Sequence, residues 1–348
     1  MVIPFRFGQS ISHSMSSSTD EVIYQETIRW KGVPVRLDAV RAEGRAFIIS
    51  GRFIKTAALK YEWQEDVDDP DRVVRELRAC PVRIDFLRFW QRIPETETKY
   101  AYHKEWRYVA AIPVTEYKHW LQKQISPKAR NKIKKSAKFG VVIEETELTD
   151  ELVRGIMDIF NQAPVRRGKR FWHYGKDFET VKKEMSLDLN ESIFITAYYG
   201  KELVGFIKLL FADRYAMLTL ILDKIDHRDK APMNGMIAKA VEICAGRKVP
   251  HIVYMMWRRG GHGEFQESNG FERIPIPEYF VPLTFKGAIA LRLGLHTGVR
   301  GLIPDKVMLR LLALRAKWYA TKYGCRPVEL VGNSGSDTGI SNRKKAAP

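Results

Sequence analysis

Residues 227–246 constrain the fold more than any other segment, because they place a basic loop directly before a stretch with helical apolar spacing. Pro232 suits the first helical position, and Gly246 suits the C′ residue after the last turn. The preceding run, residues 215–222, is apolar enough to be a buried strand. A strand, a basic loop and a helix in this order present helix amides to an anionic group. The helix would bury Met233, Met236, Ile237, Ala240, Val241 and Cys244.

The chain carries 58 Lys and Arg against 41 Asp and Glu, a formal net charge of +17 over 348 residues. This excess indicates acidic partners, namely phosphorylated small molecules, RNA or an anionic membrane surface. The N-terminus lacks the apolar region and cleavage pattern of a signal peptide, and no run reaches the roughly 18 apolar residues of a membrane span. We therefore expect a cytoplasmic protein, with peripheral contact to the inner face of the membrane as an alternative.

Cysteine usage is sparse. Cys80, Cys244 and Cys325 are scattered through the chain without CxxC or metal-ligand spacing. Small disulfide scaffolds and cysteine-based zinc sites use several closely spaced cysteines. The sequence therefore predicts neither a disulfide framework nor a metal site.

Residues 21–125 have the pattern of a small α/β unit and contain no motif of any reaction. We expect strands at 51–63, 82–93 and 103–114 and a helix at 69–80. The flanking termini are polar and Ser-rich or Gly-rich, so they are expected to be mobile.

Residues 126–140 predict a strongly basic helix. Ser126 suits the N-cap, Pro127 the first turn and Gly140 the C′ position. A narrow stripe of Ala129, Ile133 and Ala137 is expected to be buried. Two interpretations remain open for the basic side chains, a solvated face or a site for polyanions such as RNA, a nucleotide or anionic lipid. These side chains are Lys128, Arg130, Lys132, Lys134, Lys135 and Lys138.

A second basic segment, residues 164–178, interleaves cations with aromatic rings. Guanidinium groups bind carboxylates or phosphates in pairs of hydrogen bonds, and aromatic faces hold rings. The segment therefore suits recognition of a phosphorylated, sugar-like or nucleobase acceptor; the alternative is a surface loop fixed by buried aromatics. The residues concerned are Arg166, Arg167, Lys169, Arg170, Phe171, Trp172, His173 and Tyr174.

Hairpin strands follow at 192–200, 202–211 and 214–223, and after the opening helix come a strand at 251–257, a short helix ending in NGF and a last strand. In this order, residues 192–284 resemble the acyltransferase half of the GNAT superfamily. Over residues 45–284 the chain resembles its FemAB-like branch, and SPKARNKIKKSAKFGVVIEE is similar to the helix and strand that lead into that branch's second domain.

The resemblance implies an α/β fold with a mixed, mostly antiparallel sheet flanked by helices and a smaller N-terminal α/β unit of related fold. The expected organisation is a mobile N-terminus (1–20), a reduced GNAT-like unit (21–125), an acyltransferase domain (126–284), a basic helical extension (285–330) and a disordered tail (331–348). We expect the extension to pack against the main domain, with a membrane-surface element as the alternative.

The resemblance also implies an enzyme that transfers an acyl or aminoacyl group to an amine of a cell-envelope or polysaccharide precursor. Two departures bear on the donor. The acyl-CoA loop pattern Q/R-x-x-G-x-G/A is here Arg228-Asp229-Lys230-Ala231-Pro232-Met233, without its glycines, and a common catalytic tyrosine position holds Gln266. The co-substrate, acyl-CoA or aminoacyl-tRNA, therefore stays open, and no bound cofactor is expected. The expected donor contacts are the side chains of Arg228 and Lys230 and the backbone amides of Asn234 and Gly235.

Strands 214–223 and 251–257 splay apart in this fold, by resemblance, and expose a backbone amide to the acyl carbonyl. Asp223 or Glu264 is the candidate base for the amine, and Tyr254 or His227 the candidate acid. The acceptor set is Arg166, Arg170, Trp172, His173, Tyr174 and Trp257. The alternatives are a non-catalytic RNA-binding protein on the same fold and an acyl-CoA-dependent N-acetyltransferase of a small amine or amino sugar.

Overall fold

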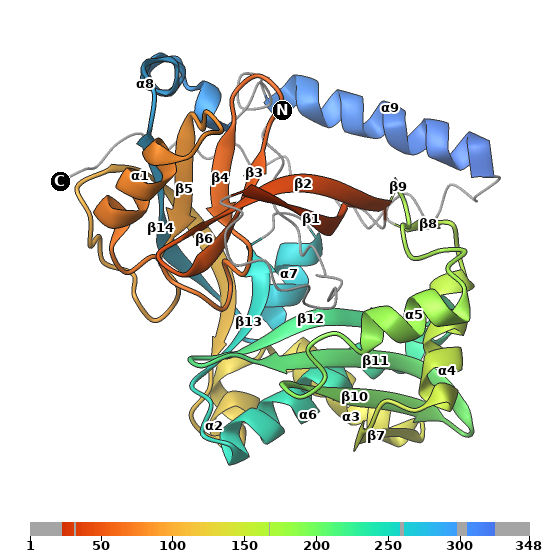
Figure 1. Cartoon of the computed structure of the whole chain (residues 1–348). Coiled ribbons are helices and arrows are strands. Elements are labelled where there is room, and N and C mark those ends of the chain that lie inside the picture. The colour runs from red at the N-terminus through yellow and green to blue at the C-terminus, as the bar shows by residue number, and fades with distance from the viewer. Residues whose placement is uncertain (1–22, 31–32, 167, 258–260, 298–304, 324–348) are drawn as a thin grey trace.

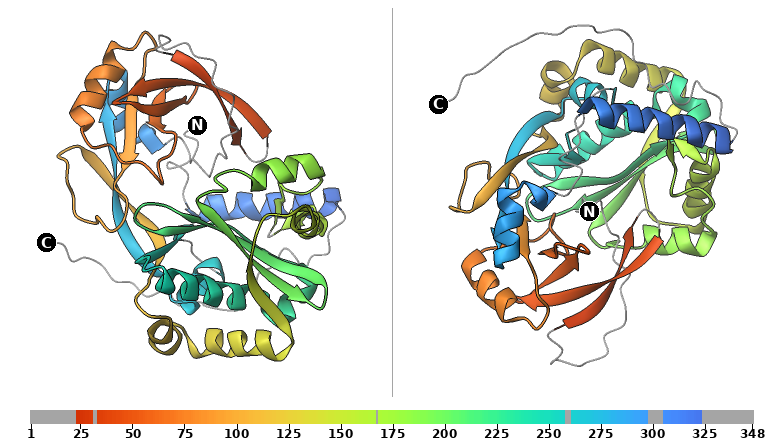
Figure 2. Two further views of the ribbon diagram at one scale, coloured as in Figure 1. Left: turned by 60° about the horizontal axis from the view of Figure 1, so that its bottom comes forward. Right: turned by 90° about the horizontal axis from the view of Figure 1, so that it is seen from above.

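The computed structural model describes residues 23–30, 33–166, 168–257, 261–297 and 305–323. The predictions for residues 1–20 and 331–348 lie outside these ranges. A mixed, mostly antiparallel sheet of twelve strands runs through the molecule, with helices on both of its faces (Figures 1 and 2). Its strand order is β1-β2-β3-β4-β5-β14-β6-β13-β12-β11-β10-β7.

The second half, residues 126–284, supplies one end of the sheet. Four strands pair antiparallel in the order β7, β10, β11 and β12. Helices α3 and α6 cover one face of these strands. Helices α4 and α5 cover the other face, where they pack on Phe194 and Phe206. The elements are β7 (Val141–Thr146), β10 (Ser192–Tyr199), β11 (Glu202–Phe211), β12 (Ala216–Asp223), α3 (Pro127–Lys138), α4 (Asp150–Asn161), α5 (Phe178–Met185) and α6 (Pro232–Gly246).

The first half supplies the other end. Strands β1 to β4 form an antiparallel meander, and β5 follows helix α1 and pairs parallel with β4. The strand predicted over residues 51–63 is reduced to β4, because Gly51 adopts φ +100° and turns the chain before the strand begins. The elements are β1 (Ile23–Trp30), β2 (Val33–Ala42), β3 (Arg45–Ser50), β4 (Thr56–Leu59), α1 (Pro70–Ala79) and β5 (Phe86–Trp90).

The two halves exchange strands at the centre of the sheet. Strand β6 (His103–Pro113), which precedes the basic helix, pairs with both β13 (His251–Met256) and β14 (Glu272–Pro282). Strand β14, the last of the second half, pairs in turn with β5 of the first half. Each half thus completes its sheet with a strand of the other, which joins them into one continuous backbone hydrogen-bonded layer.

The ends of helices α3 and α6 can be compared with the N-cap, first-turn and C′ positions predicted from the sequence. Ser126 caps α3 by accepting a hydrogen bond of 3.1 Å from the Ala129 amide, and Gly140 follows with φ +78°, as predicted. The buried stripe of α3 differs, because Ser136 is buried and Ala137 exposed. Helix α6 begins at Pro232 as predicted, but Gly246 lies inside it and Lys248 takes the left-handed conformation at φ 56°.

The C-terminal helices lie outside the sheet. Helix α9 contacts the short hairpin of β8 and β9, which agrees with the expected packing. Among the described helices, none has the length and hydropathy needed to cross a membrane. The remaining elements are α2 (Tyr117–His119), η1 (Trp120–Gln124), β8 (Val165–Arg166), β9 (Lys169–Arg170), η2 (Ile225–Lys230), α7 (Gly261–Ser268), α8 (Phe285–Arg292), η3 (Leu295–Thr297) and α9 (Asp305–Tyr323).

Candidate active site

Strands β12 and β13 separate shortly after they begin. Their parallel pairing covers Ala216 with Ile252 and Met217 with Val253, and it ends there in the described chain. Figure 1 shows β13 turning away from β12 beyond this point. The splay implied by the resemblance is therefore present, and the strand edges on either side of it face a gap rather than each other.

Both strands are irregular beside the gap. Strand β12 carries an extra residue, Thr219, whose hydroxyl donates a 3.0 Å hydrogen bond to the Lys208 carbonyl of β11. Strand β13 changes register between Val253 and Met256, and Met255 has φ 52°. A left-handed conformation costs a side-chain-bearing residue about 1–2 kcal/mol. Bulges re-aim backbone groups and are frequent next to active sites, so the irregularities of both strands fit a site in the gap.

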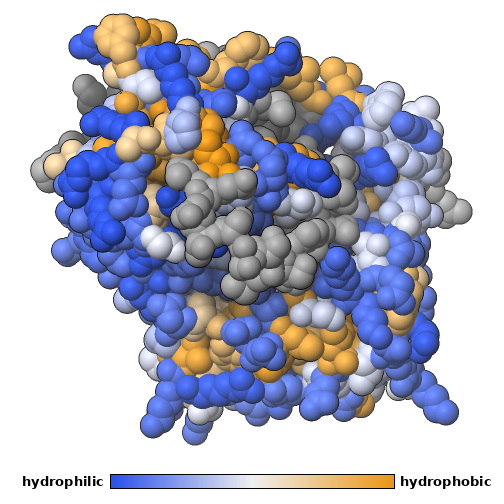
Figure 3. All heavy atoms as spheres, viewed as in Figure 1, coloured by the Kyte–Doolittle hydropathy of each residue, from blue (hydrophilic) through white to orange (hydrophobic). Residues whose placement is uncertain are grey.

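Apolar side chains surround the gap. In Figure 3, which has the same view as Figure 1, apolar residues gather over the second half in the region of β11 and β12. Leu220, Leu222 and Tyr254 are each partly buried against the cores on the two faces. Backbone hydrogen bonds are stronger in such apolar surroundings than in water.

Three predicted site residues meet at the end of β12. The Arg228 guanidinium donates a 3.1 Å hydrogen bond to the Asp223 carboxylate, and Arg166 donates to the Asp223 carbonyl at 3.3 Å. The Asp223 side chain is 9% exposed, whereas that of Arg228 is 48% exposed. The structure therefore brings together the candidate base Asp223, the candidate donor contact Arg228 and the candidate acceptor contact Arg166.

The loop before α6 presents fewer cations than the sequence predicts. His227 pairs with Glu202 at 3.2 Å, and Lys230 lies against the Tyr199 ring, 4.9 Å from its centroid. Ala231 takes the left-handed conformation, φ 55° and ψ 43°, at the position of the first glycine of the acyl-CoA motif. An alanine thus adopts at this position a backbone conformation that glycine takes more readily.

The Asn234 side chain points into the core, and the backbone at Gly235 packs closely against α3 and β7. The Asn234 amide donates a 2.8 Å hydrogen bond to the Asn269 side chain, and both residues are buried. A Cβ on Gly235 would lie 3.1 Å from Ser136 Oγ and 3.3 Å from Ile143 Cδ1. Both positions therefore fix α6 against its neighbours, and a side-chain role of Asn234 in donor contact has no support in this geometry.

The aromatic segment divides into buried and exposed parts. Arg170 is exposed, as are Trp172 and Tyr174, at 37% and 45%. His173 is 2% exposed, and its ring centroid lies 3.5 Å from that of Trp172. This burial is contrary to the prediction that His173 contacts an acceptor at the surface. Burial, together with Lys176 and Arg166, holds the pKa of His173 well below its usual range.

The other predicted residues lie along β13 and α7. Tyr254 is half-buried with its ring 5.8 Å from Phe271, Trp257 is partly buried, and Glu264 is exposed. Gln266, at the position of the common catalytic tyrosine, is fully buried and donates a 3.4 Å hydrogen bond to the Tyr254 carbonyl. This glutamine holds the helix to the strand, a role that the sequence pattern did not indicate.

Searches against protein-family models and curated protein sequences found no significant match. Among solved structures, the chain is similar to the C-terminal domain of a putative lysylphosphatidylglycerol synthetase from Agrobacterium fabrum, with a TM-score of 0.50 and 15% identity over 73% of this chain and 86% of that one. It is also similar to FemX, with a TM-score of 0.50 and 9% identity over 74% of this chain and 88% of that one. These likenesses and the splayed strands show that the chain has a GNAT-like fold of the FemAB type.

Proposed function

We propose that this protein is an N-acyltransferase that moves an acyl or aminoacyl group to an amine of a cell-envelope or polysaccharide precursor. The gap between β12 and β13 carries the proposal. A carbonyl that lies between the two strand edges can accept hydrogen bonds from backbone amides, which stabilise the oxyanion formed on attack by the amine. The names of the similar structures, FemX and a lysylphosphatidylglycerol synthetase, agree with a cell-envelope acceptor.

Proton transfer falls to side chains near the gap. The amine must lose a proton to attack, and the leaving group must gain one. Asp223, at the end of β12, and Glu264, on α7, are the proposed bases, while Tyr254 and His227 are the proposed acids. Of the two bases, Asp223 is the better positioned, because two arginines fix its carboxylate and its carbonyl.

The donor loop favours aminoacyl-tRNA over acyl-CoA. Pro232 has no amide hydrogen, the Asn234 side chain hydrogen-bonds Asn269 in the core, and Gly235 has no side chain, so among its side chains the loop offers a diphosphate little more than Arg228. Helix α3 instead exposes five lysines, Lys128, Lys132, Lys134, Lys135 and Lys138. A row of exposed lysines suits the RNA backbone.

The C-terminal extension supports contact with an anionic membrane. In α8 and at its C-cap, the exposed apolar residues Phe285, Ile289 and Leu293 are spaced four apart, which places them on one helix face. Helix α9 exposes Val307, Leu311, Leu314 and Trp318 at helical spacing beside basic residues. Apolar side chains with flanking cations are typical of helices that lie on membrane surfaces, and a lipid-linked acceptor would be met there.

A thermal-shift screen followed by a transfer assay tests the proposal. The protein is melted with acyl-CoAs, aminoacyl-tRNA and nucleotide sugars, because a ligand of the native state raises the melting temperature. Donors that bind are then offered with amine acceptors, and the amide product is measured by mass spectrometry. Aminoacyl-tRNA binding with amide formation is the expected result. Salt-sensitive RNA binding without transfer from any donor would instead favour a non-catalytic RNA-binding protein.

A further inference from the structure

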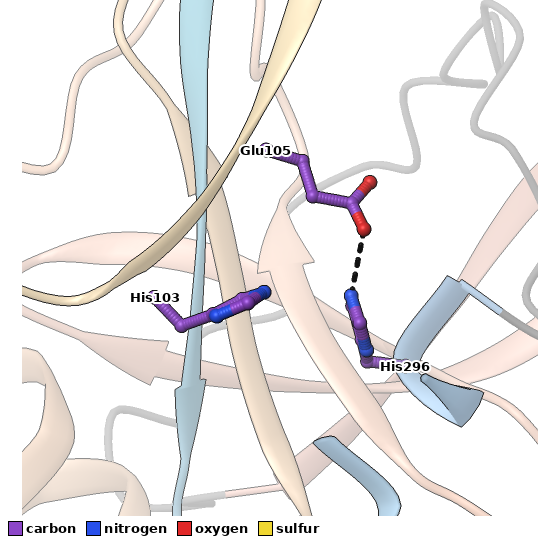
Figure 4. Close-up of side chains that lie close together, drawn as sticks. All are labelled: His103, Glu105 and His296. Carbon is purple, nitrogen blue, oxygen red and sulfur yellow. Dashed lines mark hydrogen bonds and ion pairs between the residues drawn. The ribbon is translucent and has the colours of Figure 1, made fainter. Parts of the chain in front are cut away.

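Two histidines and a glutamate from distant parts of the chain converge on one side of the sheet (Figure 4). His103 and Glu105 are two residues apart on β6 and so share a face of the strand. His296 comes from η3 of the C-terminal extension, and its Nε2 lies 2.8 Å from Glu105 Oε1. One ligand atom of each residue lies within 4.8 Å of the others.

The surroundings of this cluster resemble those of a preformed metal-binding site. His296 is 6% exposed, and its Nε2 is the ring nitrogen that faces Glu105. Its ring packs at 4.7 Å from Phe280 and 5.2 Å from His103. Apolar walls of this kind limit solvent access to a metal site and tune it.

The carboxylate of Glu105 faces two partners. Its Oε1 faces His296, while its Oε2 lies 3.7 Å from the Arg107 guanidinium. Arg107 itself also pairs with Glu278, which is buried on the neighbouring strand. Ligating carboxylates are commonly held by such an outer partner, which fixes their orientation. Arg107 thus orients the carboxylate, and its Oε1 is directed at the His296 nitrogen beside which an ion would bind.

From this arrangement we infer that His103, Glu105 and His296 bind a divalent transition-metal ion, Zn²⁺ in the first instance. Two imidazoles and one carboxylate are a zinc ligand set, with a water in the fourth position. Calcium and magnesium favour all-oxygen sites, so the two imidazoles argue against them. Ligand atoms already within 4.8 Å of one another need small side-chain rotations to reach a common ion at about 2.0–2.2 Å.

The ion would fix the C-terminal extension to the centre of the sheet. Strand β6 lies between β13 and β14, where the halves exchange strands, and η3 follows α8 of the extension. The cluster is separate from the candidate active site. Along β6, Glu105 is about 13 Å from Val109, which pairs with Met256 beside the gap, at roughly 3.3 Å per residue. We therefore assign the ion to holding the extension in place and not to the transfer step.

Zinc binding by the full chain tests this inference. Untagged protein is stripped with a chelator, dialysed against Zn²⁺, and its metal content and affinity are measured by elemental analysis and competition with a chromophoric chelator. His103→Ala is the main variant, since His103 is exposed and its loss leaves the core intact; Glu105→Gln is the second. His119→Ala is the matched control, because His119 is an exposed histidine on α2.

We expect one tightly bound Zn²⁺ per wild-type chain and an affinity at least about tenfold lower in His103→Ala and Glu105→Gln, with His119→Ala unchanged. Zn²⁺ should raise the melting temperature of the wild type and of the control but not of His103→Ala. Equal affinity in the wild type and His103→Ala, or no stoichiometric zinc in the wild type, would overturn the inference and leave Glu105 and His296 as a plain ion pair.

Discussion

The Arg228 guanidinium donates a 3.1 Å hydrogen bond to the carboxylate of Asp223. Arg228 stands in the donor loop and Asp223 at the end of β12, so this pair connects the predicted donor contact with the proposed base. Only Nε of Arg228 makes this hydrogen bond, and a guanidinium has five N–H donors. A donor phosphate that binds the terminal nitrogens would therefore lie next to an Asp223 carboxylate that stays in place.

Replacement of the proposed bases tests their role in proton transfer. If either Asp223 or Glu264 takes the amine proton, alanine at that position should lower kcat at least about tenfold, because general-base catalysis contributes about 10²–10⁴ in rate. The rates are measured with the donor that the thermal-shift screen identifies, and melting curves confirm that each variant is folded. Wild-type rates in both variants would remove both carboxylates from the mechanism.

The donor loop offers a comparison between two of its cations. Arg228→Gln should weaken donor binding about tenfold, since a charge-assisted hydrogen bond contributes about 1.5–3 kcal/mol. Lys230→Gln should have a smaller effect, because Lys230 is 15% exposed and is held by Asp229 and the Tyr199 ring. Donor Kd is measured for both by isothermal titration. Equal losses, or the larger loss in Lys230→Gln, would contradict the assignment.

Local signals in the sequence located most elements. Pro232 and Ser126 each begin a helix where predicted, because capping and proline preferences act within a few residues. The strand exchange left no such signal, since β6 and β14 are separated by more than 150 residues and backbone pairing does not depend on a motif. The bulges at Thr219 and Met255 and the burial of His173 depend on tertiary packing for the same reason.

Two glycines, one just after α3 and one at the end of α6, allow a matched test of where each helix ends. Gly140 has φ +78°, whereas Gly246 is inside α6, and neither has an atom within 4 Å of an added Cβ. Gly140→Ala should therefore destabilise the protein by about 1 kcal/mol, while Gly246→Ala should stabilise it by up to about 1 kcal/mol. Urea unfolding measures both. Destabilisation by Gly246→Ala would show that Gly246 ends the helix in solution, as the sequence suggested.

His173 should make the protein sensitive to mild acid. Burial, with Lys176 and Arg166 nearby, lowers the pKa of His173 in the folded chain well below the value of about 6.5 expected when unfolded. Below pH 6.5 the unfolded state therefore binds a proton that the folded state does not. Stability from this residue is fully present above pH 6.5 and falls by up to about 1.4 kcal/mol per pH unit below it.

The comparison with His173→Phe isolates this contribution. Phenylalanine keeps an aromatic ring beside Phe160 and Trp172 but cannot titrate. Urea unfolding at pH 7.5, 6.5 and 5.5 should show the wild type losing stability relative to the variant mainly between the two lower values. Other histidines, such as His251, whose pKa burial lowers, are common to both proteins, so their contributions cancel in the difference. Parallel pH profiles would mean that His173 takes up its proton in the folded state, which requires access to water. In that case it would again be a candidate for contact with the acceptor.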